Sequence, residues 1–168
     1  STLNAQTGGS SSFATLDLPL SARSAAIGGN CMAINDNDIN LAVWNPSMLS
    51  SKMHTQFSFS IADYMSDIKY GYAGFAYHFK KVGTFAFTMS NIDYGKFQET
   101  DNTGAVVGEF SAGEYGLNVA YGRMIDSSFS IGATAKFVQS NLYLWKSNAM
   151  CVDIAARYKI PHRNFTAS

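Results

Sequence analysis

The side chains that could carry out chemistry are few in this sequence and are not grouped. The three histidines, His54, His78 and His162, are far apart, and no Ser, Asp or Cys stands with any of them in a nucleophile motif. Histidines scattered in this way are typical of solvent-exposed or interfacial positions. We therefore expect no catalytic residue, and we expect that the protein is not an enzyme.

Cofactor and metal sites are also not expected. Gly28 and Gly29 are not followed by the Gly-Lys-Ser/Thr ending of a phosphate-binding loop. Cys31 and Cys151 lack the CxxC spacing of a zinc site. The sequence leaves open whether these two cysteines pair in an oxidising compartment, and two separate thiols are the simpler interpretation.

Four charged residues fall at alternate positions of otherwise apolar runs: Glu114, Lys136, Asp153 and Arg157. On neighbouring strands they would form a polar ladder along one face of a sheet. Two roles fit such a ladder, structural ion pairing and a path for a polar substrate. Interior charges are expected in any transmembrane barrel, which favours the structural role.

The elements that would position these residues are strands. Residues 56–158 contain about six runs of roughly ten residues, each apolar at every second position, joined alternately by short turns and by longer polar loops. This pattern predicts an all-β fold, an antiparallel transmembrane β-barrel whose outer face contacts lipid. The side chains expected to face lipid are Phe57, Phe59, Phe85, Phe87, Leu117, Val119, Ile131, Val152 and Ile154.

Local patterns add four expectations. A break in the alternation at Gly74 predicts a β-bulge. Asn45 before Pro46 predicts a short helix over residues 46–50. The connection over residues 93–112 is expected to form a separate hairpin outside the membrane. Aromatic residues beside the short turns predict an interfacial girdle on the periplasmic side; these are Tyr77, Phe79, Phe85, Tyr121, Phe129 and Tyr158.

Composition excludes a helical membrane protein and argues against a soluble β-sandwich. Charged residues make up 14% of the 168 residues, against about 25% in an average soluble domain. A soluble β-sandwich should carry more charge on its exposed face, and no run of about 20 apolar residues could form a membrane-spanning helix. The formal net charge of +0 gives no electrostatic reason to expect binding to nucleic acid or to an anionic surface.

The chain divides into three expected segments. Residues 1–5 are similar to the end of a secretory signal peptide, residues 6–53 form an N-terminal segment rich in small residues, and residues 54–168 hold the strands. Six strands cannot close a barrel, because about eight is the smallest known number. We therefore expect that the chain is a fragment, the first half of a barrel, with the missing strands C-terminal to Ile160.

Three stretches resemble the PorV/PorQ group of outer-membrane proteins, within the wider set of barrels that are similar to the fatty-acid transporter FadL. They are residues 18–29, residues 36–47 with the Asn45-Pro46-Ser47 element, and residues 92–97 together with 108–112. The third stretch resembles PorQ more closely than PorV. The resemblance implies a monomeric barrel of about fourteen strands in the type IX secretion system of Bacteroidota.

The same resemblance implies partners and no cofactor. PorQ-like proteins are thought to hold a surface protein, PorZ, in the complex that attaches cargo to lipopolysaccharide. The alternative is a FadL-like transporter of hydrophobic small molecules, with the N-terminal segment as a plug. Aromatic residues in the long loops are candidates for the partner contact, although they could also pack on the barrel rim or form a membrane belt: Tyr94, Phe97, Phe110, Tyr143 and Trp145.

Overall fold

The computed structural model of the chain is a single antiparallel sheet in which every strand pairs with its neighbours in sequence. It describes residues 13, 21–26, 28, 37–63, 68–100, 106–142, 145–160 and 165–167. Residues 1–5, Cys31, Tyr143 and His162, which carry some of the expectations above, lie outside the described residues. The strands are β1 (Gln56–Asp63), β2 (Lys69–Phe79), β3 (Gly83–Thr100), β4 (Val106–Met124), β5 (Phe129–Leu142), β6 (Trp145–Ile160) and the short β7 (Phe165–Ala167).

The expected alternation of side chains between two faces is confirmed. Burial alternates residue by residue along β1 and through most of β4, so one face of the sheet is covered and the other is exposed. Strand order is β1 to β7 without a crossover, which makes β1 and β7 the edges of the sheet in the described residues. The all-β, antiparallel part of the prediction is therefore correct.

The prediction of a bulge at Gly74 is wrong. Gly74 lies opposite Ser58 on β1 and Thr88 on β3, and the register of both pairings passes through it unbroken. The sequence pattern breaks there for a different reason. Tyr70 and Tyr72 point to the covered face, whereas Phe75 and Tyr77 lie on the exposed face, so the aromatic residues change face while the strand stays regular.

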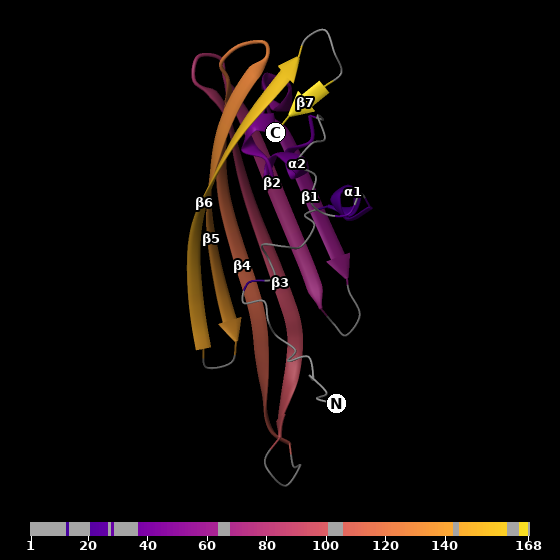
Figure 1. Cartoon of the computed structure of the whole chain (residues 1–168). Coiled ribbons are helices and arrows are strands. Elements are labelled where there is room, and N and C mark those ends of the chain that lie inside the picture. The colour runs from indigo at the N-terminus through magenta and orange to yellow at the C-terminus, as the bar shows by residue number, and fades with distance from the viewer. Residues whose placement is uncertain are drawn as a thin grey trace, which may run out of the picture.

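The connection over residues 93–112 forms a hairpin, as expected, and this hairpin continues β3 and β4. Phe97 lies opposite Phe110, beyond the ends of the pairing with β2 at Asp93 and with β5 at Ala112. A register shift between Asp93 and Lys96 marks where the extension begins. Figure 1 shows this hairpin projecting past the neighbouring strands at the lower end of the sheet.

The short turns gather at the opposite end of the sheet (Figure 1). The β2–β3 turn closes with a hydrogen bond from the Val82 N–H to the Phe79 carbonyl (3.1 Å), as the Lys-Lys-Val-Gly sequence predicts. The β4–β5 turn closes with a bond from the Ile125 N–H to the Phe129 carbonyl (2.9 Å). One end of the sheet therefore carries tight turns and the other carries the long connections.

The covered face of the sheet is packed by residues 39–53. They form α2 (Ile39–Ala42) and two 3-10 turns, η2 (Pro46–Met48) and η3 (Ser51–Met53), while α1 (Ala22–Ala26) lies earlier in the chain. Ile39, Leu49 and Met53 form a buried cluster with three strand alanines, whose small side chains leave room for the segment: Ala76, Ala86 and Ala120. The helix expected over residues 46–50 is the shorter turn η2, with Asn45 as its N-cap.

Among the described residues, no helix is both long enough and apolar enough to cross a membrane.

Candidate lipid-facing surface and inner face

The exposed outer face of the sheet consists of continuous apolar rows. One row of cross-strand partners runs through Phe57, Phe75, Phe87, Val119, Ala135 and Val152, and the next through Phe59, Ala73, Met89, Leu117, Phe137 and Met150. All nine side chains that were expected to face lipid lie on this face, and each is more than a third exposed. An apolar surface of this extent is unusual for a protein in water.

These apolar rows end at a common border towards the long loops. Beyond the Met89–Leu117 level the next row contains Asn91, Gln139 and Asn148, with Tyr115 between Asn91 and Gln139. The row after that is charged or polar on nearly every strand: Asp63, Lys69, Asp93, Gly113, Asn141 and Lys146. The outer face therefore changes from apolar to polar within two rows across six strands.

At the short-turn end the outer face carries a belt of aromatic rings in contact. Ring centroids are 4.7 Å apart for Tyr77 and Phe79, 5.8 Å for Phe79 and Phe85, and 5.0 Å for Phe85 and Tyr121. The Tyr121 hydroxyl also donates a hydrogen bond to the Val82 carbonyl in the turn (2.7 Å). Phe129 and Tyr158 face each other as cross-strand partners nearby, so the six aromatic residues of the expected girdle lie beside the short turns.

The inner face is polar and its charges form local pairs rather than one ladder. Lys136 Nζ lies 2.6 Å from Asp153 Oδ2 and 5.7 Å from the centroid of the Trp44 ring. Arg157 is four residues beyond Asp153 and donates to the Ser130 hydroxyl (3.2 Å). These short contacts favour the structural role over a continuous substrate path.

Glu114, the fourth member of the expected ladder, lies near the long loops. Tyr94 is beside it, and burial of the Tyr94 hydroxyl, followed by the negative charge of Glu114 and a hydrogen bond to it, raises the pKa of Tyr94. Between Glu114 and Lys136, the inner position of β4 is taken by the neutral Asn118, which donates to the Thr88 hydroxyl (3.1 Å). The expected ladder is therefore interrupted.

Residues 39–53 pack against the sheet at two glycines, Gly122 and Gly132, and we call this pair of glycines the seat. Gly122 and Gly132 are cross-strand partners, and a Cβ atom added to either would lie 2.5 Å from the Pro46 carbonyl oxygen. The Ser130 hydroxyl donates to the Ser47 carbonyl (2.8 Å), which connects this seat to Arg157. Sequence reasoning did not identify the seat, although both glycines fall at inward positions of adjacent strands.

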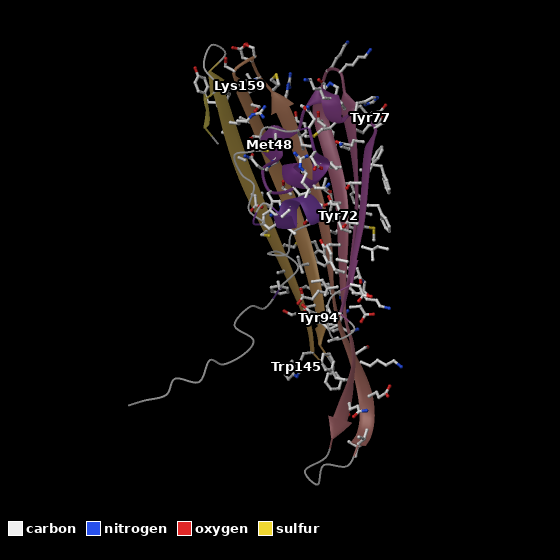
Figure 2. The ribbon with its side chains drawn as sticks, turned by 90° about the vertical axis from the view of Figure 1, so that its right-hand side faces the viewer. Met48, Tyr72, Tyr77, Tyr94, Trp145 and Lys159 are labelled. Atoms are coloured by element: carbon white, nitrogen blue, oxygen red, sulfur yellow. The ribbon has the colours of Figure 1, made fainter. Side chains whose placement is uncertain are left out.

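An inner aromatic cluster was also not expected. Tyr70 and Tyr72 are buried with Val43 and Ile92, and Trp44 packs against them. A Cβ atom at Gly74 would lie 2.7 Å from the Tyr72 hydroxyl oxygen, so this glycine leaves the space that the ring occupies. Figure 2 shows Tyr72 at mid-height of the sheet, between Met48 and Tyr94.

Of the described residues expected to contact a partner, only two are brought together. Phe97 and Phe110 stack on the hairpin, with ring centroids 5.3 Å apart. Tyr94 instead packs against the inner aromatic cluster, and Trp145 lies at the start of β6, 80% exposed. In Figure 2 both Tyr94 and Trp145 lie towards the long-loop end, far from Lys159.

Three small cavities lie near the ends of the sheet. One of about 290 Å³ is lined by Lys52, Arg157 and Lys159 among several serines, and one of about 250 Å³ is lined by Lys80, Lys81 and Arg123. A third, of about 320 Å³, lies at the long-loop end beside Asn91 and Asp93. None of these three is lined mainly by apolar side chains.

Groups that could hold a metal ion are missing from the described part of the chain, where no three His, Cys, Asp or Glu side chains converge. Cys151 is a half-buried free thiol. His54 and His78 meet at the short-turn end, where the His78 N–H donates to His54 Nδ1 (3.3 Å), and His54 packs edge-on against Tyr77. The His54 ring therefore lies at the edge of the aromatic belt, whereas the His78 ring lies against the buried Thr84 hydroxyl, with Nδ1 and Oγ1 2.9 Å apart.

Comparison of the chain with protein-family models, with curated proteins and with solved structures gives no significant match in any of the three.

Proposed function

We propose that this chain forms part of the wall of a β-barrel in a bacterial outer membrane, without catalytic activity. The observation that carries the proposal is the common border of the apolar rows. A sheet that keeps its polar residues on a covered face and exposes aromatic and aliphatic rows has the inside-out distribution that lipid requires. A sheet packed on one face in water has the opposite distribution.

The dimensions of the apolar band support a bilayer as its surroundings. On β5 the outward apolar positions run from Phe129 to Phe137, and on β6 from Met150 to Tyr158. The eight steps from the first to the ninth residue, at about 3.4 Å each, extend about 27 Å along a strand. A strand tilt of about 40° reduces this to about 21 Å, close to the roughly 25 Å apolar band of such barrels.

The lengths of the turns indicate which end of the sheet would face the periplasm. Short turns lie on the periplasmic side in this class of barrel and long loops lie outside. The aromatic belt from Tyr77 to Tyr121 then marks the periplasmic interface, and the Asn91 row marks the outer one. The β3–β4 hairpin beyond Asp93 would stand clear of the membrane surface.

The position of that hairpin supports a role as an anchor for a surface protein. Its two faces differ, because the register shift between Asp93 and Lys96 places Phe97 opposite Phe110 on the side that continues the inner face. The outward side carries Lys96 and Glu109, whose charged atoms are 3.5 Å apart. We propose, following the resemblance to PorQ, that the Phe97–Phe110 side holds a PorZ-like partner in a type IX secretion system.

The transporter alternative has less support from the described residues. A carrier of hydrophobic molecules needs a continuous apolar pocket. The inner face instead carries buried polar side chains such as Asn118, Thr134 and Arg157, and residues 39–53 are packed against it. The three cavities described above are small, from about 250 to about 320 Å³, and two of them are lined largely by polar groups.

The proposal is tested by extraction and co-purification from membranes. The wild-type protein should resist alkaline carbonate extraction and should recover a surface protein when purified in mild detergent. Phe97→Ser with Phe110→Ser should lower that recovery about tenfold or more, because paired aromatics at an interface centre typically contribute at least 2 kcal/mol. The matched control, Lys96→Gln with Glu109→Gln, alters the other side of the same hairpin and should leave recovery unchanged.

Release of the protein by carbonate would refute the membrane assignment. Membrane retention with equal recovery of partner by both hairpin variants would refute the anchoring role alone. Bound lipid-like molecules in place of a surface protein would favour the transporter.

A further inference from the structure

The balanced charge of the chain conceals a separation of charge along the sheet. The sequence has 12 Lys and Arg against 12 Asp and Glu, and this balance gave no reason to expect an anionic partner. In the structure the short-turn end, residues 50–54, 78–84, 122–130 and 157–160, carries six cationic side chains and one acidic side chain, Asp126. The six are Lys52, Lys80, Lys81, Arg123, Arg157 and Lys159.

The long-loop end has the opposite balance. Its described residues include five acidic side chains and three lysines: Asp63, Asp93, Glu99, Glu109 and Glu114, with Lys69, Lys96 and Lys146. Lys96 is paired with Glu109, and Lys69 lies between Asp63 and Asp93 in the register. Cations are therefore compensated at this end.

At the short-turn end three of the cations lie away from carboxylates. Within the described part of the chain, no carboxylate lies within ion-pair distance of Lys80, Lys81 or Arg123. The three side chains are exposed, and they line the cavity of about 250 Å³ together with the hydroxyl-bearing Ser50 and Ser51. Like charges concentrated in this way create a positive potential that an anion can neutralise.

Lys80, Lys81 and Arg123 lie directly beyond the aromatic belt. Lys80 follows Phe79, Arg123 is two residues past Tyr121, and the Tyr121 hydroxyl bonds to the turn at Val82. Aromatic belts sit at the boundary between hydrocarbon and headgroups. The next level outward, where these cations lie, is the level of lipid phosphates.

We propose that the exposed rim formed by the β2–β3 turn and the end of β4 binds the phosphate group of an anionic glycerophospholipid, with Lys80, Lys81 and Arg123 as its cationic contacts. The inference rests on the proposed function, since it needs the aromatic belt to lie at a membrane interface. The neighbouring cavity, lined by Lys52, Arg157 and Lys159 with one carboxylate, Asp126, carries further cations along the same end of the sheet.

The test is lipid retention by the full-length protein. The protein is reconstituted into bilayers of equal parts phosphatidylcholine and phosphatidylglycerol and re-extracted in mild detergent, and the lipids it retains are quantified by mass spectrometry. We expect enrichment of phosphatidylglycerol, falling about fivefold for each cation removed, because a basic side chain near an anionic surface contributes a factor of this size. The variant Lys80→Gln, Lys81→Gln, Arg123→Gln should abolish the enrichment.

The matched control removes the same net charge from the other end of the sheet. Lys69→Gln, Lys96→Gln and Lys146→Gln together should leave the enrichment unchanged, so an equal loss in this variant would overturn the site. Failure of the wild type to enter bilayers would refute the proposed function, whereas entry without enrichment would overturn this inference alone. Retention of inorganic phosphate or of lipid A through the same three residues, without enrichment of phosphatidylglycerol, would overturn the assignment to a glycerophospholipid.

Discussion

Two glycine residues decide how closely the inner segment approaches the sheet. At Gly132 an added Cβ atom would lie 2.6 Å from the Ser47 backbone nitrogen, and backbone atoms cannot move aside as a flexible side chain can. Gly132→Ala should therefore lift η2 from β5 and lower the free energy of unfolding by about 1–3 kcal/mol, the usual range for overpacking. The measurement is the urea midpoint of the protein in detergent.

Gly71→Ala is the control for this effect. Gly71 also lies within a strand, but an added Cβ atom there meets nothing within 4 Å. Alanine should be tolerated or slightly stabilising at this position, because it restricts the unfolded chain. Equal destabilisation by the two substitutions would show that contact with Pro46 and Ser47 is not what requires glycine at position 132.

At the scale of elements, strand positions could be predicted because burial on one face imposes a period of two on the sequence. That period located the six strands β1 to β6, and it placed Phe87, Val119 and Ile154 on the exposed face. At β2 it located the strand but not its faces, because Tyr70 and Tyr72 look apolar in sequence but belong to the inner face. Periodicity reports that two faces differ, but it cannot say which face a tyrosine prefers.

The site was less predictable because it depends on contacts between distant residues. The seat at Gly122 and Gly132 exists only because Pro46, more than 70 residues earlier, lies against it. The border of the apolar rows required the register of five strand pairs. The aromatic stack of Phe97 and Phe110 required a bulge whose signal, Tyr94-Gly95, lies within a sequence that otherwise reads as a loop.

That bulge controls which side of the hairpin carries the aromatic pair. Gly95 has φ of 78°, and its N–H bonds to Asp93 Oδ1 (2.9 Å). Gly95→Ala should cost about 1–2 kcal/mol locally, since L-residues are disfavoured in this conformation. Hydrogen exchange should then speed up over the hairpin beyond Asp93 and stay unchanged in the rest of β3 and β4.

Gly108→Ala, in the facing strand, is the matched control. Gly108 has no positive φ, and an added Cβ atom would meet only the flexible side chain of Glu99, with its carboxylate oxygen at 3.2 Å and its Cβ at 3.9 Å. Exchange over the hairpin should remain close to wild type. Acceleration that spreads into the pairing of β4 with β5 in either variant would show that the hairpin is not an independent extension.

For the whole molecule, the two faces and the two ends of the sheet carry independent information. The difference between the apolar outer face and the polar inner face indicates which solvent surrounds the sheet. The tight turns and basic residues at one end, and the long loops and acidic residues at the other, indicate the direction in which the sheet would cross a bilayer. Net composition hides both, because a sum over residues is the same however they are arranged in space.

The free-energy cost of placing a charged residue on the outer face should therefore depend on the row of the sheet in which it lies, rather than on the charge itself. Val119 lies in the middle of the apolar rows, and Asn91 lies on β3 at the polar border, two rows away in the register. Val119→Arg should destabilise the inserted protein by about 2–4 kcal/mol, the cost of Arg at the bilayer midplane, while Asn91→Arg should cost about 0–1 kcal/mol, as at an interface. Both variants add one positive charge to an outward position, so reversible unfolding from vesicles, followed by Trp fluorescence, isolates the effect of depth. Equal costs for the two variants would mean that water or protein covers Val119, and the membrane placement of the sheet would have to be abandoned.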